Sequence, residues 1–395
     1  MKIRHVMWPL LFLFFVLVSR FIYYYFFDKQ APLLVLTGIT VGASYAGDVN
    51  CSLLLNKKSK VTMWLDMVLI ADKHLVPASD IHNFIIPTKT MGNGKHNLKV
   101  EAIDTTFAQN KTVVDYPFIV DNQPLNGVFI GFEEIHKVFQ GRTIHVQIQF
   151  NKLVSSVVAR FLSQTYDCFQ ESNHSMVYET FIPVQCEENP NEYLLTVEAV
   201  DAVGNTLTLE TKIQIVLFPF KKHTLAVSEE KMKKEEELVE SEKDLGLLLE
   251  DLTNRSPKQK LWKGVFCTPI DIVRTTCDFG TIRTTQRKGR YAHKAVDVIN
   301  APRSVVWAPQ DGVVVVKERF LYSGNTIVID HGYGILSLFG HLDDFAKINV
   351  GDAVKKGSPI GTLGKTGYAS GYHLHWEMRV GNVPVDPMQW TKPNF

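Results

Sequence analysis

The fold is decided by His293-Lys-Ala-Val-Asp297, Gly340-His-Leu-Asp343 and His373-Leu-His-Trp-Glu377, all in the last third of this 395-residue chain. Imidazole and carboxylate groups bind zinc in catalytic sites, where three protein ligands leave a fourth position for water. Side chains in a strand alternate between its two faces, so both rings of a His-x-His pair face the same side. The stretches therefore predict a metal site on a β-sheet.

Further landmarks stand around these stretches in a fixed order: Gly324-Asn-Thr-Ile-Val-Ile-Asp-His-Gly332, Val350-Gly-Asp-Ala-Val-Lys-Lys-Gly357, Gly364-Lys-Thr-Gly367 and Val385-Asp-Pro387. In order and spacing, residues 260–395 resemble the M23 family of zinc metalloendopeptidases, the lysostaphin and LytM type. These enzymes cut peptide bonds of bacterial peptidoglycan. The resemblance implies a C-terminal all-β LytM/M23-type peptidase domain.

Carried over to this sequence, the resemblance implies three zinc ligands, His293, Asp297 and His375, and two catalytic histidines, His341 and His373. Zinc lowers the pKa of bound water from about 15.7 toward 7 and polarises the scissile carbonyl. A histidine that titrates near neutrality suits the base that the attack needs and the proton donor that the leaving amine needs. Which histidine performs which role stays open.

Two positions depart from the family pattern. Ala295 stands where the family usually has glycine, and its methyl group is tolerated unless φ is positive there. Phe339 replaces a tyrosine two residues before the middle histidine. The loss of this hydroxyl removes a group that could help to hold the oxyanion, so it affects the expected rate but not metal binding.

Residues near the motifs also allow purely structural interpretations. His331 follows a strand-like run and opens a Gly-Tyr-Gly turn, and we predict that it is structural; Asp330 is interpreted as a turn residue. Glu377 lies two residues after His375 and so on the same face of a strand. It either orients a metal ligand or is a solvated charge at the strand end.

The N-terminal segment, residues 1–27, is interpreted as an uncleaved signal anchor. Lys2 and Arg4 precede an almost wholly apolar run from Val6 to Val18, and aromatic residues follow Arg20. The segment is long enough for a bilayer, and no Ala-x-Ala-like cleavage site ends it. The basic residues favour a cytoplasmic N-terminus. We therefore predict a single-pass protein of the bacterial inner membrane with its C-terminal domains in the periplasm or outside.

Residues 32–218 show short alternating runs separated by turn residues, and they contain an internal repeat. Lys95–Asp104 matches Glu192–Asp201, at a spacing close to the roughly 100 residues of one immunoglobulin-like sandwich. We predict two Ig-like β-sandwiches, at 32–121 and 122–218. They are interpreted first as a stalk that sets reach, and alternatively as a module that binds the wall or a protein partner.

Residues 221–256 form a charged linker that we expect to be helical. Ser228 provides an N-cap, and two Glu-Lys pairs at i,i+4 follow it. Leucines between 245 and 252 are expected to pack on a neighbouring domain. A further hypothesis is that this helix covers the zinc cleft as an autoinhibitory lid.

Composition and cysteine usage limit which partners, disulfides and metal sites the chain can have. The net charge of +1 gives no argument for nucleic acid as a partner. Outside the membrane disulfides are allowed. Cys168 with Cys186 and Cys267 with Cys277 could pair locally, which would leave Cys51 single. No Cys-x-x-Cys is present, which argues against a thiolate zinc site or a redox motif.

Three classes of function were compared. The first is a zinc metalloendopeptidase that hydrolyses peptide cross-links or stem peptides of peptidoglycan. The second is a catalytically weak or inactive LytM-type regulator that activates another wall hydrolase, and Phe339 keeps this alternative open. The third, a lipoyl- or biotinyl-like carrier suggested by Val350–Gly357, would have no use for the histidines. The first class is our prediction.

Overall fold

The computed structural model describes residues 4–224, 229–285 and 289–393. The described chain is mainly β, as predicted, and forms two compact units. The first unit contains residues 1–124 and 202–205, and the second contains residues 125–201 and 206–395.

The chain begins with helix α1 (Arg4–Phe27), over the segment for which we predicted a membrane anchor. Arg20 and the tyrosines after it interrupt the apolar character of this helix. Among the residues whose placement the structure describes, no helix combines the length and the apolar character that a membrane crossing requires. The predicted transmembrane helix is therefore not supported.

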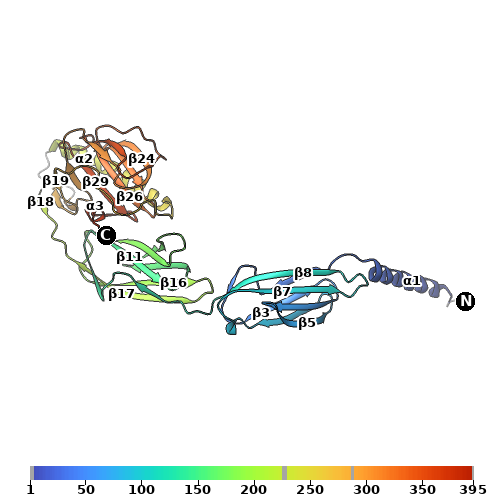
Figure 1. Cartoon of the computed structure of the whole chain (residues 1–395). Helices are drawn as coiled ribbons and strands as arrows, with labels where there is room; N and C mark the ends of the chain where they lie inside the picture. The colour runs from blue at the N-terminus through green and yellow to red at the C-terminus, as the bar shows by residue number, and fades with distance from the viewer. Residues whose placement is uncertain (1–3, 225–228, 286–288, 394–395) are drawn as a thin grey trace. The chain divides into compact units, whose positions relative to one another are not determined.

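The first unit contains a β-sandwich whose two sheets share one core (Figure 1). One sheet has the order β1-β3-β6, and the other has the order β2-β8-β7-β4-β5. Buried Leu53 and Leu55 of one sheet meet Val61, Leu98 and Val100 of the other. The strands are β1 (Leu34–Thr37), β2 (Ser44–Tyr45), β3 (Val49–Leu55), β4 (Ser59–Leu65), β5 (Val68–Val76), β6 (Ile81–Ile86), β7 (Gly94–Asp104) and β8 (Lys111–Val120), with one 3-10 turn at Thr88–Thr90.

The second unit begins with another β-sandwich, whose five-stranded sheet has the order β10-β17-β16-β12-β13. The repeat found in the sequence falls on β7 and β16, the central strands of the two five-stranded sheets. The strands that follow the repeat are β8 and β17. At the edge of the first sheet β2 pairs in parallel with β8, and at the edge of the second β10 pairs in parallel with β17. The second sheet has the order β14-β15-β11-β9. The strands are β9 (Gly127–Phe129), β10 (Ile135–Phe139), β11 (Thr143–Phe150), β12 (Val154–Phe161), β13 (Gln164–Asp167), β14 (Phe169–Gln170), β15 (Val177–Pro183), β16 (Glu192–Asp201) and β17 (Thr206–Val216).

The C-terminal part of the second unit is built on one large sheet with the order β19-β22-β29-β26-β25-β24-β27, and β30 pairs with β29. Two smaller sheets have the orders β18-β20-β21 and β23-β28. The bounds are β18 (Lys222–Thr224), β19 (Arg274–Cys277), β20 (Ile282–Thr285), β21 (Gly289–Ala292), β22 (Val296–Ile299), β23 (Val305–Trp307), β24 (Gly312–Phe320), β25 (Gly324–Asp330), β26 (Ile335–Leu342), β27 (Ala353–Val354), β28 (Pro359–Thr362), β29 (Leu374–Val380), β30 (Val383–Val385) and helix α3 (Pro387–Trp390).

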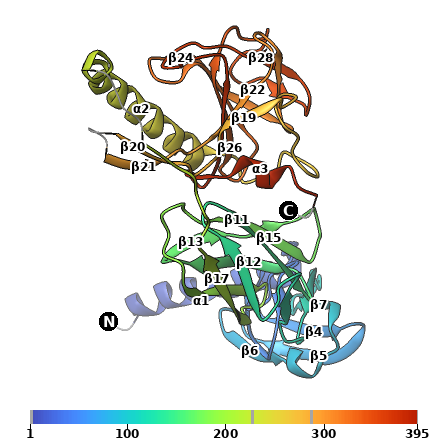
Figure 2. The same ribbon diagram turned by 90° about the vertical axis from the view of Figure 1, so that its left-hand side faces the viewer.

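Helix α2 (Glu229–Arg255) packs on the large sheet near β24 and β26 (Figure 2). Leu245 and Leu249 are buried against Val316, Val328 and Leu338. Leu248 and Leu252 also pack against this cluster, so the expected packing is confirmed for four leucines, but it is wrong for Leu247, which is 56% exposed. Leu338 pairs with Glu377, so the helix covers the face of the sheet from which His375 and Glu377 also project. The lid hypothesis stays a prediction.

The second sandwich packs directly on the C-terminal domain. Phe169 and Phe181 of the sandwich share a core with Trp262, Phe266 and Trp390 of that domain. Polar contacts surround this core: Gln389 exchanges two hydrogen bonds of 2.8 Å with the backbone of Thr143, and Arg142 forms a 2.5 Å ion pair with Asp386.

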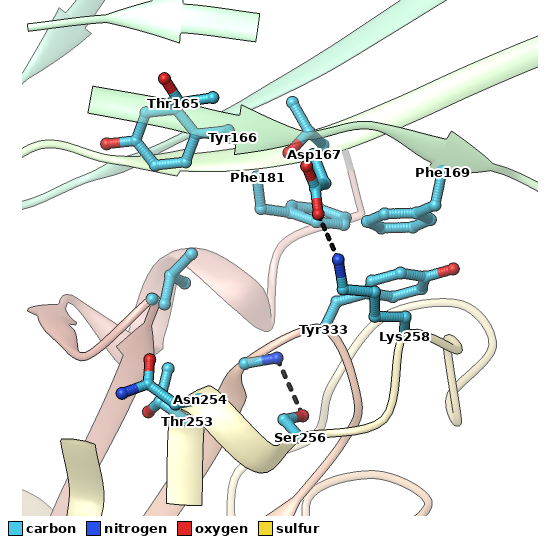
Figure 3. A pocket seen from close by; sticks show the side chains of 14 residues that line it. Thr165, Tyr166, Asp167, Phe169, Phe181, Thr253, Asn254, Ser256, Lys258 and Tyr333 are labelled. Atoms are coloured by element: carbon cyan, nitrogen blue, oxygen red, sulfur yellow. Dashed lines mark hydrogen bonds and ion pairs between the residues drawn. The ribbon is translucent and has the colours of Figure 1, made fainter. Parts of the chain in front are cut away.

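A pocket lies beside the same contact (Figure 3). Across it Lys258 reaches Asp167 at 2.5 Å, and the ring of Tyr333 stacks on Phe169. The sequence did not predict that the sandwich and the C-terminal domain form one compact unit.

Neither of the local disulfides that the sequence allows is formed, because all five cysteines are free thiols. Cys168 packs against the core of the second sandwich, whereas Cys186 packs against the core of the C-terminal domain. Cys267 lies beside the carbonyl groups of Ala308 and Pro309, while Cys277 is buried at the end of β19.

Candidate metal centre

The central strands of the large sheet bring the predicted ligands together. Asp297 in β22 lies opposite His375 in β29, and His375 also lies opposite Gly340 in β26. Leu374 and Trp376 point into the core on one face of the sheet, so His375 projects from the other face. His293 precedes β22 and is buried, with 7% of its surface exposed.

Two of the three predicted metal ligands, His293 and His375, converge on one carboxylate oxygen of the third, Asp297. Asp297 Oδ1 lies 3.0 Å from His375 Nδ1 and 3.1 Å from His293 Nε2. Despite that short distance, His293 Nε2 makes no hydrogen bond, although it is buried. A buried polar atom without a partner is costly unless a ligand satisfies it. A zinc ion bound by two imidazoles and a carboxylate fits this donor set.

The charges of these groups are strongly coupled. Burial opposes ionisation of Asp297, but the His293 and His375 rings beside it hold the pKa of its carboxyl well below the usual range. Burial lowers the pKa of His375, yet its hydrogen bonds to Asp297 and Glu377 raise that pKa to about 9. Without a metal, a proton on His375 therefore faces the ionised Asp297. Metal binding at this place would release that proton.

The two predicted catalytic histidines lie next to these ligands. The rings of His341 and His373 have their centroids 4.7 Å apart, and His373 Nε2 is 3.9 Å from Asp297 Oδ1. His341 Nδ1 donates to the carbonyl of Thr366 at 2.8 Å, and His373 Nδ1 donates to that of Gly371 at 2.9 Å. Because a carbonyl only accepts, each ring carries its proton on Nδ1 and keeps Nε2 free as an acceptor.

His341 has two further features. Burial, followed by the charges of His375 and His373, lowers its pKa to about 3, so the ring is neutral at pH 7. Its backbone has φ of 60°, in the left-handed region that residues other than glycine seldom adopt. Such strained backbone is found at functional sites, where the surrounding structure enforces it.

The structure resolves the alternatives for Glu377. Its carboxylate is buried, with Oε2 3.9 Å from His375 Nε2 and Oε1 2.5 Å from Arg379 Nε. It is therefore not a solvated charge at a strand end. A carboxylate facing the second nitrogen of a metal-binding histidine fixes the orientation of that ring.

Two neighbours of the site were missed in the sequence. The guanidinium of Arg283 lies 3.2 Å from Asp297 Oδ2, and it also neighbours the thiol of Cys277. Both residues lie before the first motif, where no spacing rule pointed to them. The absence of Cys-x-x-Cys argues against a thiolate zinc site built on such a pair, but it does not bear on a single thiol beside the histidines.

The two departures from the family pattern have small consequences. Ala295 is buried, but its φ is not positive, so the methyl group is tolerated as expected. Phe339 is fully buried in the core and lies opposite Trp376, whereas His375 projects from the other face. A tyrosine at this position would point away from the metal centre. The expectation that Phe339 costs the site an oxyanion ligand is therefore wrong.

The predicted structural residues do have structural roles. His331 is fully buried, with Nδ1 2.7 Å from the carbonyl of Asp311 and Nε2 2.9 Å from Ser337 Oγ. Asp330 accepts hydrogen bonds from Ser256 Oγ and from the backbone of Gly332. It therefore fixes the turn that follows β25.

Comparisons with known proteins agree with this geometry. The sequence pattern of peptidase family M23 matches residues 291–387. Peptidoglycan DD-endopeptidase ShyC of Vibrio cholerae serotype O1 is 32% identical over 126 residues, which is 32% of this chain and 29% of that protein. DD-carboxypeptidase/endopeptidase Mpg of Neisseria meningitidis serogroup B is 35% identical over 101 residues, or 26% of this chain and 23% of that protein. The matches thus span less than a third of the length of either relative.

Among solved structures, a zinc containing peptidase from Vibrio cholerae is similar over 75% of this chain and 81% of its own length. Its sequence identity is 15% and its TM-score is 0.31, so this likeness carries no argument about the site. The family match, by contrast, covers His293, Asp297, His341, His373 and His375. Residues 291–387 of this chain are a domain of peptidase family M23.

Proposed function

We propose that this chain is a zinc metalloendopeptidase that hydrolyses peptide bonds of bacterial peptidoglycan. The observation that carries the proposal is the convergence of His293 Nε2 and His375 Nδ1 on Asp297 Oδ1, with two further histidines beside them. The names of the relatives support peptidoglycan as the substrate.

In the proposed mechanism His293, Asp297 and His375 hold the zinc ion, which when bound activates water and polarises the scissile carbonyl. The Nε2 atoms of His341 and His373 both point away from their carbonyl partners and can accept a proton. His341 is neutral at pH 7 and so acts as an acceptor in the resting state. A histidine that has taken up a proton can then give it to the leaving amine.

We further propose that the bond cut is a cross-link between two stem peptides. The relatives that match are named DD-endopeptidases, which supports a bond between two D-configured residues over a glycine bridge. Stem peptides that are not cross-linked form the second substrate class to be tested.

The test is a muropeptide profile of purified sacculi incubated with the full chain and zinc. The proposal expects loss of cross-linked species, with product masses that identify the bond. Asp297→Ala is expected to leave the profile unchanged, because it removes the oxygen on which both ligand histidines converge. His174→Ala, in an exposed turn of the second sandwich, is the control and is expected to behave as the unmodified chain.

If the chain is instead an inactive LytM-type regulator, the opposite result is expected in this assay. This alternative expects an unchanged profile with the unmodified chain and faster hydrolysis when a separate wall amidase is present. No observation at the site favours it, because Phe339, on which it depended, lies on the core side of the sheet.

The location of the protein remains a prediction. Peptidoglycan lies outside the cytoplasmic membrane, so the proposed substrate requires that residues 260–395 face the periplasm or the exterior. Protease digestion of intact spheroplasts tests this orientation: a C-terminal tag that is cleaved supports it, and a tag that is protected contradicts it. A protein partner of the sandwiches likewise remains a prediction.

A further inference from the structure

A cysteine lies beside the predicted metal ligands, and the sequence motifs did not include it. We propose that Cys277 is a further protein ligand of the metal ion that His293, Asp297 and His375 hold. The inference rests on the metal centre of the proposed function, but it concerns a residue that no motif of the resemblance contains and that lies outside the family match to residues 291–387.

The sheet places Cys277 at the site. It is the last residue of β19 and lies directly opposite Asp297 in the antiparallel pair of β19 with β22. Residues that face each other in this way project from the same side of a sheet. A register shift just before Cys277 changes the direction of the strand at this point. The thiol is buried with Asp297 and His293 and is not in a disulfide.

The distances fit a common ion. One donor atom each of Cys277, His293 and Asp297 lie within 4.8 Å of one another. Zinc bonds sulfur at about 2.3 Å and nitrogen or oxygen at about 2.0–2.2 Å, so two donors of one ion are at most about 4.5 Å apart. The group within this limit contains Cys277, His293 and Asp297 but not His375, so all four donors bind one ion only after the site closes around it. The thiol also neighbours Thr281, Arg283 and the carbonyl of Asp278, at 3.8 Å, and metal binding would replace these contacts.

A second observation points to a ligand in the same place. His293 is 93% buried, given its 7% exposure, and its Nε2 atom makes no hydrogen bond. This nitrogen belongs to the cluster that contains the sulfur. Burial raises the pKa of the Cys277 thiol, and the neighbouring Arg283 guanidinium, 3.2 Å from Asp297 Oδ2, acts in the opposite direction and favours the thiolate that a metal binds.

A sulfur ligand has a consequence for activity. Four protein ligands close a zinc site, whereas a catalytic site keeps one position for water. With Cys277 bound, the metal is held in a closed state. Binding of Cys277 to the metal would release the thiol proton to solvent. Exchange of the sulfur for water would break one sulfur–metal bond and return a proton to the sulfur, and no group would be oxidised or reduced.

The test uses the full-length protein, freed of metal and loaded with an equimolar amount of Co²⁺. A thiolate bound to Co²⁺ gives a charge-transfer absorption in the near ultraviolet, and imidazole and carboxylate ligands do not. We expect this band in the unmodified chain and in Cys267→Ser, whose thiol lies beside Pro309. We expect its loss in Cys277→Ser. An identical band in all three proteins, or no band in the unmodified chain with Co²⁺ bound, overturns the inference.

Zinc-edge X-ray absorption of the unmodified protein needs no variant and so does not depend on how Cys277→Ser folds. The inference expects one sulfur neighbour at about 2.3 Å. Nitrogen and oxygen neighbours alone overturn it while leaving the proposed function intact. Failure to bind either metal overturns both.

Affinity and rate give a third measurement. Loss of a direct ligand should raise the zinc dissociation constant of Cys277→Ser by about 100-fold or more, beyond the 10–100-fold typical of outer-shell residues. At equal zinc occupancy Cys277→Ser should hydrolyse sacculi faster than the unmodified chain. Slower hydrolysis contradicts the closed state.

Discussion

The buried His331 makes the stability of the C-terminal domain depend on pH in a way that can be calculated. Its ring is fully buried, Nδ1 donates to the carbonyl of Asp311, and Nε2 lies 2.9 Å from the hydroxyl of Ser337. Burial lowers the pKa of this histidine from 6.5 to about 4. The test compares how the stabilities of the unmodified chain and of His331→Asn respond to a fall in pH. The amide of the asparagine can still donate to the carbonyl of Asp311.

The sign follows from the direction of the shift. Between pH 6.5 and pH 4 the unfolded chain binds a proton at this position that the folded chain does not. The free energy of unfolding therefore decreases as the pH falls through this window and recovers as it rises. One site with these two pKa values removes about 2 kcal/mol between pH 7 and pH 5, and about 3 kcal/mol by pH 4.

Tryptophan fluorescence during urea unfolding is a suitable assay. Phe266 packs edge-on against His331, and Trp262 and Trp390 pack against Phe266, so these indoles report on the surroundings of the ring. We expect His331→Asn to be less stable at pH 7 but to lose about 2 kcal/mol less than the unmodified chain on moving to pH 5. His174→Asn, at an exposed turn, controls for general effects of histidine replacement. Equal losses in His331→Asn and in the unmodified chain, at matched zinc, would refute the reasoning.

Three other predictions concern the neighbours of the site and the packing of the second unit. Glu377→Gln removes the carboxylate that faces His375 and should weaken zinc binding about 10–100-fold in a chelator competition, whereas Glu318→Gln, on an exposed part of β24, should not. Arg142→Met leaves Asp386 buried without its cation and should cost about 3 kcal/mol in urea unfolding. The matched change Arg160→Met breaks a pair that is about half exposed and should cost less than about 1 kcal/mol. Leu249→Ala empties a buried position under α2 and should cost about 3 kcal/mol, whereas Leu247→Ala, 56% exposed, should change stability by less than about 0.5 kcal/mol. If α2 is a lid, Leu249→Ala should also hydrolyse sacculi faster than Leu247→Ala; equal rates would contradict that hypothesis.

Much of the site could be predicted because its residues lie in short motifs on adjacent strands. His375 and Asp297 are far apart in the sequence, but the resemblance grouped them as ligands of one metal ion, and β22 and β29 do place them opposite each other. Cys277 and Arg283 could not be predicted in this way. Their proximity to Asp297 depends on the pairing of β19 with β22 and on the placement of β20, and the sequence alone does not specify such pairings.

The interpretation of Phe339 failed for a related reason. In the linear sequence, a tyrosine two residues before a proposed catalytic histidine lies close to the candidate metal site. His341, however, adopts a left-handed backbone conformation, so the count of two cannot be followed through it as in a regular strand. The central strands of the two sandwiches were easier to recognise, because the repeat at Lys95–Asp104 and Glu192–Asp201 marks β7 and β16. The immunoglobulin-like assignment and its domain bounds stay predictions.

Because the backbone of His341 is left-handed, stability and catalysis favour different residues at this position. Glycine would adopt φ of 60° without the cost of about 1 kcal/mol that a side chain incurs there. A library screened only for thermal resistance should therefore enrich glycine or asparagine at residue 341 and so discard a proposed catalytic group. Selection for wall hydrolysis should keep the histidine. The two screens should give opposite answers at this residue, even though they start from the same sequence.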